Sequence, residues 1–285
     1  MKIVRRPDEM KNLSAAYCAA GSTIGLAPTM GALHDGHLSL LEVLRPRCDV
    51  RVMSLFINPK QFGPAEDLAA YPRPFEDDCE KAERGGCDVL FAPSPADMYP
   101  ARYATYVSVE GITERLCGAS RPGHFRGVTT VVIKLFNIIS PHVVAFGRKD
   151  AQQVMVIKRM IEDLNCPVRI VVAPTIREFD GLAMSSRNAY LTPAERSEAA
   201  LVYKGLSDAA LLYKEGESGV PRLKAALQGV WESVRLFFPE YIEVVDATTL
   251  EPVAKARDGA LMAVAVRTRE TRTRLIDNII LGGEQ

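Results

Sequence analysis

The feature that most restricts the fold of this chain is the alternation of short apolar runs with helical segments between residues 23 and 172. The apolar runs have the length of buried strands and lie at residues 23–27, 50–57, 88–92, 142–146 and 168–172. Apolar residues at helical spacing lie between them, at residues 38–44, 75–84, 128–139 and 151–164. We also expect a helix within residues 1–21 and a short strand at residues 106–109. Strands that alternate with helices form βαβ units, so we predict an α/β fold with a Rossmann-like parallel sheet over residues 1–175.

The pattern changes after Pro174. Asp180-Gly181 separates two short runs and indicates a hairpin turn. Thr192-Pro193-Ala194-Glu195 is typical of a capping box with Pro at the first helical position, so a helix begins there. A second helix is expected at residues 221–237, and strands at residues 241–245, 261–266 and 274–280. We therefore predict a smaller α+β C-terminal domain over residues 176–285, with the boundary near Thr175.

Composition excludes several classes of protein. The 285 residues are 47% hydrophobic, which is enough to bury a core. The 35 Lys and Arg residues balance the 35 Asp and Glu residues, so no global field attracts nucleic acid or an acidic membrane, and any anion needs a local site. Six cysteines without a C-x-x-C pair argue against a zinc ribbon or a disulfide framework. No signal-like segment and no long apolar run is present, so we expect a cytoplasmic protein without membrane or nucleic-acid partners.

Residues 28–37, with the sequence PTMGALHDGH, join the first predicted strand to a helix. His34 and His37 stand three apart at the helix start, so they project to one side near the positive end of the helix dipole. Gly31 and Gly36 allow a close backbone approach, and backbone N–H groups at a helix start suit an anion such as a triphosphate. The alternative is an ordinary turn whose histidines cap backbone groups.

Three further polar clusters follow predicted strands, at residues 58–61, 147–153 and 184–187. Ligands of open parallel sheets collect beyond the carboxyl ends of the strands, so the clusters favour one nucleotide-sized site. Lys149 can reach phosphates as a point charge, and Ser185-Ser186-Arg187 can form a phosphate fork. Each cluster also has a plain interpretation, because Asp150 and Gln153 can form a helix cap and residues 185–187 a bare turn.

Three other polar features are weaker indications. Gln61 alone would be a surface amide. Asp77-Asp78 can either hold hydrated magnesium or, as we favour, form a solvated helix face. His124 and His142 are expected to be structural.

Six ordered motifs resemble one family. They are Pro28-Thr29-Met30-Gly31-x-Leu-His34-x-Gly-His37, Asn58-Pro59-x-Gln61-Phe62, Tyr71-Pro72-Arg73, Gly118-x-x-Arg121-Pro122-Gly123-His124-Phe125-x-Gly127-Val128, Phe146-Gly147-x-Lys149-Asp150 and Asp180-Gly181-Leu182-Ala183-x-Ser185-Ser186-Arg187-Asn188. With a tail at Arg274-Leu275-Ile276-Asp277-Asn278, they resemble the pantothenate synthetase (pantoate–β-alanine ligase) family over nearly the whole chain. The His-x-Gly-His element alone points only to the wider cytidylyltransferase-like superfamily, which includes class I aminoacyl-tRNA synthetases.

The resemblance implies an ATP-dependent ligase. It would condense (R)-pantoate with β-alanine to pantothenate, a coenzyme A precursor, with release of AMP and pyrophosphate, through a pantoyl adenylate. It implies a homodimer in which each protomer has a Rossmann-like N-terminal domain and a smaller C-terminal domain that covers the active-site cleft. It also implies magnesium on the ATP phosphates, with no protein ligand of the metal assigned.

The resemblance also implies roles for single residues. Gln61 and Gln153 would bind pantoate, Gln61 would also bind β-alanine, and His37 would be the proton donor, in a half-reaction that the sequence leaves open. The chain departs from the family pattern at two positions. Arg148 occupies a position where we expect Glu or Gln, and Cys117 occupies a position where we expect Glu. By their own chemistry, the donors suited to the charge that builds on the phosphate oxygens are His34, His37, Lys149, Ser186 and Arg187. ATP would contact Met30, Gly31, Ala32, Leu33, His34, Asp35, Gly36, His37, Gly147, Arg148, Lys149, Asp150, Ile176, Met184, Ser185, Ser186 and Arg187.

Three rival functions stay open at this point. The first is another adenylyl transferase, for instance one that makes a dinucleotide, although Gln61 and Gln153 suit a small hydroxy acid better than a base. The second is a tRNA synthetase, which zero net charge disfavours. The third is a nucleotide-binding regulatory module without catalysis. The presence of both histidines, Lys149 and residues 185–187 argues against it.

Overall fold

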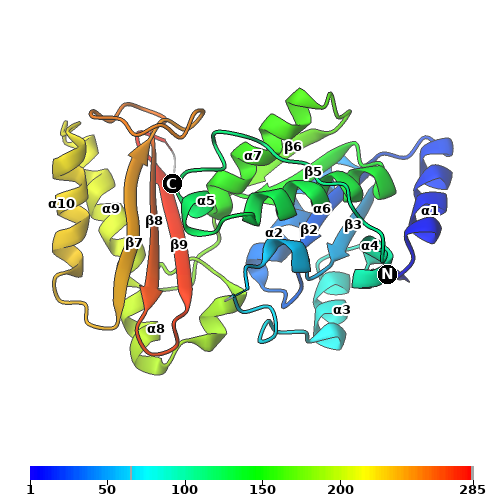
Figure 1. The fold of residues 1–285 in the computed structure, drawn as a ribbon, viewed down its shortest axis with the longest axis horizontal. Coiled ribbons are helices and arrows are strands. Elements are labelled where there is room, and N and C mark those ends of the chain that lie inside the picture. Colours follow the sequence, from blue (N-terminus) through cyan, green and yellow to red (C-terminus); the bar gives the residue numbers. More distant parts are fainter. Residues whose placement is uncertain (65, 284–285) are drawn as a thin grey trace. The chain divides into compact units, whose positions relative to one another are not determined.

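The computed structural model describes residues 1–64 and 66–283, and the chain forms two compact units (Figure 1). The first unit consists of Met1–Glu114, Arg121–Arg148 and Gln153–Ala173. The second consists of Arg115–Ser120, Lys149–Gln152 and Pro174–Gln285. Two short segments that precede the predicted boundary near Thr175 therefore group with the C-terminal part of the chain.

The first unit is built on a parallel sheet, as the alternating pattern predicts. Its strands follow the order β1-β4-β3-β2-β5-β6, and every neighbouring pair is parallel. Central strand β2 places Leu26 opposite Val52 on one side and Val144 on the other. The strands are β1 (Lys2–Val4), β2 (Ile24–Thr29), β3 (Val50–Leu55), β4 (Val89–Phe91), β5 (Val143–Gly147) and β6 (Arg169–Ala173).

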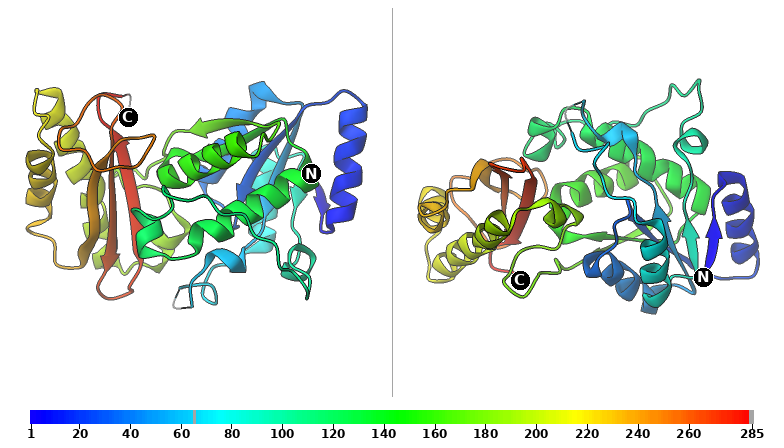
Figure 2. Two further views of the ribbon diagram at one scale, coloured as in Figure 1. Left: turned by 45° about the horizontal axis from the view of Figure 1, so that its top comes forward. Right: turned by 90° about the horizontal axis from the view of Figure 1, so that it is seen from below.

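Helices lie on both sides of this sheet (Figure 2). They are α1 (Pro7–Ala19), α2 (Asp35–Leu44), α3 (Phe75–Arg84), α4 (Pro95–Met98), α6 (His124–Ile139) and α7 (Ala151–Asp163), whose first two residues group with the second unit. Single 3-10 turns are η1 (Arg45–Arg47), η2 (Pro59–Gln61) and η3 (Arg148–Asp150), whose last two residues group with the second unit. The α/β Rossmann-like fold class is confirmed.

Helix α2 is fixed to the sheet by one apolar stripe. Leu40, Leu41 and Leu44 are at most 4% exposed and pack with Ala27 of β2 and Met53 of β3. Each fully buried leucine contributes about 1.5–3 kcal/mol. This packing sets the direction of α2, and therefore the place of the histidines in its first turn.

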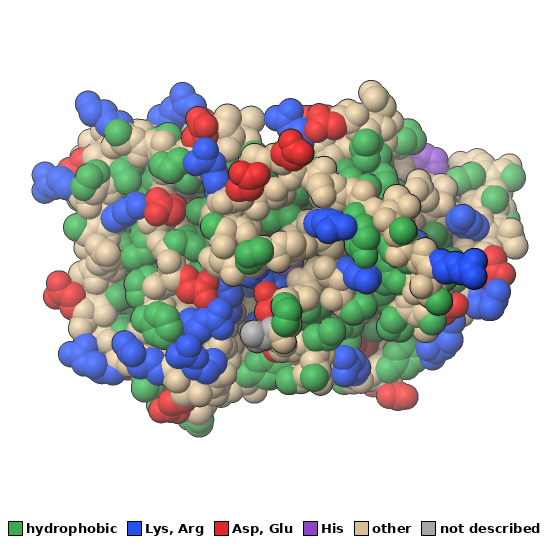
Figure 3. Space-filling view, in the orientation of Figure 1, with side chains coloured by type: hydrophobic (Ala, Val, Ile, Leu, Met, Phe, Trp, Pro, Cys, Tyr) green, Lys and Arg blue, Asp and Glu red, His purple; other side chains and the backbone are tan. Residues whose placement is uncertain are grey.

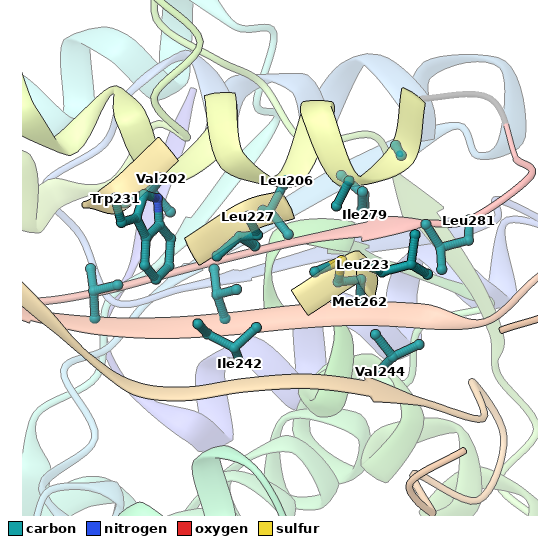
Figure 4. Close-up of a cluster of buried hydrophobic side chains, with 14 of the residues drawn as sticks. Val202, Leu206, Leu223, Leu227, Trp231, Ile242, Val244, Met262, Ile279 and Leu281 are labelled. Carbon is teal, nitrogen blue, oxygen red and sulfur yellow. The ribbon is translucent and has the colours of Figure 1, made fainter. Parts of the chain in front are cut away.

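The second unit contains an antiparallel sheet in the order β7-β8-β9, formed by β7 (Phe237–Val245), β8 (Leu261–Thr268) and β9 (Arg274–Ile280). Helices α9 (Leu201–Lys214) and α10 (Val220–Trp231) pack against it through the apolar cluster in Figure 4, which includes Leu206, Leu227 and Ile242. The Trp231 indole N–H donates to the carbonyl of Leu201 at 2.9 Å. The other elements are α5 (Cys117–Ser120), η4 (Ser186–Tyr190) and α8 (Pro193–Ala199).

Several local expectations need correction. The strand predicted at residues 106–109 is not formed, because the Val107 backbone bonds to the hydroxyls of Thr129 and Thr130 in α6 instead of to a strand. The helix predicted at residues 221–237 ends at Trp231, since Phe237 already belongs to β7. Strand β1 has no counterpart among the predicted strands, and the expected hairpin at Asp180-Gly181 is reduced to one bridge between Arg177 and Ala183.

Two surface expectations can be compared with the structure. Figure 3 shows Lys and Arg side chains mixed with Asp and Glu over the face in view, in keeping with the balanced charge. All six cysteines are free thiols in the structure. Within the described residues, no helix has the length and apolar character needed to cross a bilayer.

Candidate active site

Three neighbouring strands of the first unit carry predicted site residues at their carboxyl ends. Residues 30–37 follow β2, residues 58–61 follow β3, and Gly147 ends β5. Strand β2 has β3 on one side and β5 on the other, so the chain order reverses there. Ligands of doubly wound sheets bind at such a switch point. The topology therefore brings these three predicted segments to one edge of the sheet.

His34 and His37 lie together at the start of α2. Their ring centroids are 4.0 Å apart, with the ring planes tilted by 38°. His34 has extended backbone angles and precedes the first helical residue, and its N–H donates to Nδ1 of His37 at 3.3 Å. Both side chains are half-buried rather than packed in the core. Because Nδ1 accepts this bond, the proton of the neutral His37 ring is assigned to Nε2.

The loop before these histidines is held by a carboxylate from α3. Asp78, which is 1% exposed, accepts the N–H groups of Ala32 at 2.9 Å and Leu33 at 2.6 Å. Lys81 donates to the carbonyl of Leu33 at 2.9 Å. Burial raises the pKa of Asp78, and the two N–H donors oppose that shift. The loop has left-handed backbone angles at Gly31 and Ala32, and these contacts stabilise it.

The expectation that Asp77 and Asp78 form a solvated face is therefore wrong for Asp78. Only Asp77 faces solvent, where its carboxylate pairs with Lys81 at 2.7 Å. The sequence carries one weak signal for this difference, because neighbouring positions on a helix do not share a face. Adjacent helix positions do not share a face, and Asp78 is turned into the loop while Asp77 is at the surface, so the two carboxylates do not converge on one magnesium ion. No cluster of three or more metal-binding side chains occurs among the described residues.

Gln61 is held by contacts at both ends of its amide. Its Oε1 accepts from the amide of Asn58 at 3.0 Å, and its Nε2 lies 3.0 Å from the sulfur of Met30. The Asn58 amide also donates to the carbonyl of Gly127, and the hydroxyl of Tyr99 donates to Asn58 Oδ1 at 2.8 Å. These contacts join the loops that follow β2 and β3.

The backbone of Gln61 is held by the loop that contains Arg121. The Nδ1–H of His124 donates to the Gln61 carbonyl at 2.8 Å, and Arg121 donates to the same oxygen at 3.3 Å. The Arg121 guanidinium also donates two hydrogen bonds, of 2.8 and 2.6 Å, to the Glu66 carboxylate. Burial alone would raise the pKa of Glu66, but Arg121 outweighs it and lowers that pKa. His124, expected to be structural, thus supports a predicted substrate-binding residue.

The remaining predicted residues of the first unit are Gly147, Arg148 and Gln153, all half-buried. Lys149 and Asp150 belong to the second unit, and the Lys149 ammonium lies 3.9 Å from a carboxylate oxygen of Asp150. The predicted site residues are therefore divided between the two units, and the chain crosses from one to the other between Arg148 and Lys149.

In the second unit, the segment from Ile176 to Arg187 folds into two successive turns. The N–H of Met184 donates to the carbonyl of Ile176 at 3.0 Å. The hydroxyl of Ser185 then accepts the N–H of Arg187 at 3.3 Å and caps the 3-10 turn η4, which contains Ser186. The plain interpretation of residues 185–187 as a turn is therefore correct locally, and it is compatible with a phosphate fork.

Cys117, one of the two departures from the family pattern, is buried in the second unit. Its sulfur lies 3.2 Å from the Tyr241 hydroxyl and 3.5 Å from each terminal nitrogen of Arg274. Arg274 also donates to Glu240 at 2.7 Å. Burial, with Cys117 as a further cause, raises the pKa of Tyr241. Nothing in the sequence indicated that these residues would meet.

The first unit defines the class of protein, a Rossmann-like α/β protein with a histidine pair at the switch point of its sheet. The sequence pattern of the family described as Pantoate-beta-alanine ligase matches residues 2–280, and the chain belongs to that family. The match covers nearly the whole chain, and it is to pantoate–β-alanine ligases rather than to tRNA synthetases.

Relatives and solved structures agree with this membership. The pantothenate synthetase of Geobacter sulfurreducens is 52% identical over 285 residues, with complete coverage of both chains, and that of Acetivibrio thermocellus is 50% identical over 281 residues, or 99% of each. The crystal structure of pantothenate synthetase from Thermus thermophilus matches with a TM-score of 0.92, 42% identity and 99% coverage of both chains. A Francisella tularensis pantoate-beta-alanine ligase, complexed with Beta-gamma ATP and Beta-alanine, matches with a TM-score of 0.81, 31% identity and coverage of 100% of this chain and 99% of that one.

Proposed function

We propose that this protein uses ATP to condense (R)-pantoate with β-alanine through a pantoyl adenylate. The products are pantothenate, AMP and pyrophosphate. The observation that carries the proposal is the His34–His37 pair at the start of α2, on the same sheet edge as the fixed amide of Gln61. The Francisella tularensis relative is complexed with Beta-gamma ATP and Beta-alanine, which supports ATP and β-alanine as substrates.

In the first half-reaction, the pantoate carboxylate attacks the α-phosphorus of ATP, and pyrophosphate leaves. A carboxylic acid of this type has a pKa of about 4, so it is ionised at pH 7 and needs no general base. The barrier lies in the charge that builds on the phosphate oxygens. His34, His37, Lys149, Ser186 and Arg187 would stabilise that charge, and the loss of one such donor commonly costs about 10²–10³ in rate.

Magnesium, when bound to the triphosphate, would neutralise part of its charge. Asp77 and Asp78 do not converge on one ion, because Asp78 accepts from the Ala32–Leu33 loop while Asp77 pairs with Lys81 at the surface. We therefore assign no protein ligand to the metal.

In the second half-reaction, the amine of β-alanine loses a proton and attacks the pantoyl carbonyl, and AMP leaves. Gln61 and Gln153 would hold the small substrates through their amides, and Gln61 is already oriented by Asn58. The Nε2 of His37 can hold or move a proton in either half-reaction. The loop between Gln61 and Tyr71, in which residue 65 lies outside the described residues, would close to exclude water from the adenylate.

The test follows the two half-reactions in order. Protein, ATP and pantoate should support exchange of labelled pyrophosphate into ATP, and β-alanine added second should release AMP and pantothenate. Exchange without pantoate would favour a different adenylyl transferase, and ATP binding without any turnover would favour a regulatory module.

We also propose that the protein is a cytoplasmic homodimer. The assembly rests on family membership, and the six free thiols suit a reducing compartment. Sedimentation equilibrium should give about twice the 31.3 kDa mass of one chain, and a single-chain mass would contradict the dimer.

A further inference from the structure

The tail motif, residues 274–278, belongs to the family pattern but has no part in the proposed reaction. It lies in β9, where Asp277 and Asn278 stand opposite Val264 and Ala263 of β8. Asp277 is 3% exposed and Asn278 is 4% exposed. A buried carboxylate or amide is costly unless it is hydrogen-bonded, so the partners of these two residues define what they do.

Asn278 holds the backbone at Lys149. Its Nδ2 donates to the carbonyl oxygen of Lys149 at 2.8 Å, across a sequence separation of 129 residues. Lys149 lies in η3 (Arg148–Asp150), directly before α7. The bond fixes the peptide from which the Lys149 side chain departs, so it limits where the ammonium group can go.

Asp277 holds the turn that begins at Ile176. Its carboxylate accepts from Arg177 at 2.6 and 3.1 Å, and Arg177 also donates to the carbonyl of Gly181 at 3.1 Å. The Arg177 guanidinium stacks 3.5 Å from the ring centroid of Tyr203. Arg177 is thus fixed at three points, and its neighbour Ile176 accepts the N–H of Met184.

The charges in this region are linked as well. Burial raises the pKa of Asp277, while Arg177 and, more weakly, Lys149 lower it. The N–H of Asn278 donates to Asp277 at 2.8 Å, so the two adjacent residues of β9 are also bonded to each other. A substitution of Asp277 or Asn278 is therefore expected to affect both Lys149 and the turn that begins at Ile176.

We infer that Asp277 and Asn278 are positioning residues, which hold Lys149 and the turn from Ile176 to Met184 in the geometry that the triphosphate requires. The inference rests on the proposed function, since it takes these two segments as parts of the ATP site. Asp277 and Asn278 themselves touch no reacting atom in this scheme. They connect the last strand of the sheet to two segments that are remote in sequence.

The first test separates the two half-reactions in Asn278→Ala. Loss of the donor should lower pantoate-dependent pyrophosphate exchange about 10²-fold, the effect of a displacement near 1 Å at a reacting centre. Conversion of supplied pantoyl adenylate with β-alanine should be unchanged, because pyrophosphate has already left. Equal loss in both half-reactions, or normal exchange, would overturn the inference.

A second test uses pH rescue in Asn278→Asp. The ionised carboxylate cannot donate to the Lys149 carbonyl, whereas the protonated acid can. The exchange rate relative to the unmodified protein should therefore rise as pH falls and the introduced acid becomes protonated. A ratio that stays flat across the range in which the unmodified protein remains folded would count against positioning by this donor.

A neighbouring strand position provides the matched control. Ile279 is 3% exposed and packs in the apolar cluster of the second unit, so Ile279→Val should remove only apolar packing and leave the rates of both half-reactions unchanged. Hydrogen exchange of the peptide at residues 148–153 should accelerate in Asn278→Ala and not in Ile279→Val. Hydrogen exchange needs no turnover, so it tests the positioning independently of activity. If the unmodified protein showed no pantoate-dependent pyrophosphate exchange, that result would refute the proposed function but not the positioning.

Discussion

The backbone N–H of His34 donates to Nδ1 of His37 at 3.3 Å, and the two imidazole rings lie 4.0 Å apart. This bond selects the His37 tautomer with its proton on Nε2. It arises because His34 has extended backbone angles just before α2, which directs its N–H towards the side chain three residues on. The same contact satisfies a backbone N–H at the helix start and is compatible with the proposed role of His37 as a proton donor.

The two ring nitrogens of His37 can be tested separately. The amide of His37→Asn can replace the Nδ1 acceptor, whereas that of His37→Gln reaches towards the Nε2 position. We expect His37→Ala and His37→Asn to lose about 10²–10³ in pyrophosphate exchange, the usual value of one donor to a developing charge, and His37→Gln to lose less. The matched control is His142→Asn, which keeps an acceptor for the Ile24 N–H and should not change exchange. Equal exchange in His37→Asn and the unmodified protein would refute the role of Nε2.

Asp78 and Asp77 give a matched pair on one helix. Asp78→Ala leaves two N–H groups of the loop without their acceptor and should lower the free energy of unfolding by about 1–3 kcal/mol and raise the KM for ATP. Asp77→Ala removes only an exposed i,i+4 ion pair, which contributes about 0.3–0.5 kcal/mol. Urea titration and steady-state kinetics measure both effects. Identical KM values for ATP in the two variants would contradict a role of Asp78 in the loop.

Gly127 tests the packing behind Gln61. A Cβ at this position would stand 2.3 Å from the carbonyl oxygen of Lys60, so Gly127→Ala must displace the backbone at Lys60 and Gln61. We expect a lower melting temperature and a raised KM for pantoate. The control is Gly229→Ala in α10, where nothing lies within 4 Å and a helical alanine should stabilise by about 0.5–1 kcal/mol. A Gly127→Ala protein with an unchanged KM for pantoate would argue against this route to Gln61.

Glu195 should make stability depend on pH. Burial raises the pKa of Glu195, but bonds from Thr271 and Thr192 outweigh burial and bring the pKa below the ordinary value of 4.5. A lowered folded-state pKa adds stability that is fully present above pH 4.5 and is lost as pH falls through the folded value.

The measurement compares the unmodified protein with Glu195→Gln. Near pH 7 the variant should be less stable by about 1.5–3 kcal/mol, since the amide loses charge-assisted bonds. The difference in free energy of unfolding should shrink below pH 4.5. A difference that is constant from pH 7 to pH 3.5 would show that the carboxylate charge does not contribute.

The sequence predicted the parallel sheet because buried strands and helices have different apolar periods, and those periods can be read along residues 23–172. It failed where a local pattern meets a competing partner. Residues 106–109 alternate like a strand, but Thr129 and Thr130 take the bonds of Val107. In the same way, the sequence predicts that Asp78 is a surface carboxylate, whereas in the structure it is buried and accepts hydrogen bonds from Ala32 and Leu33.

The sequence by itself determined the fold class, the histidine pair at the start of a helix, and membership of the ligase family, because these depend on periodicity and on ordered short motifs. The tertiary structure decided which residues support the predicted ones. Asp78 at the loop of Ala32, His124 at the carbonyl of Gln61, and Asn278 at the carbonyl of Lys149 are such supports. Each joins positions between 46 and 129 residues apart, and hydrogen bonds over such separations follow from the path of the folded chain rather than from local spacing.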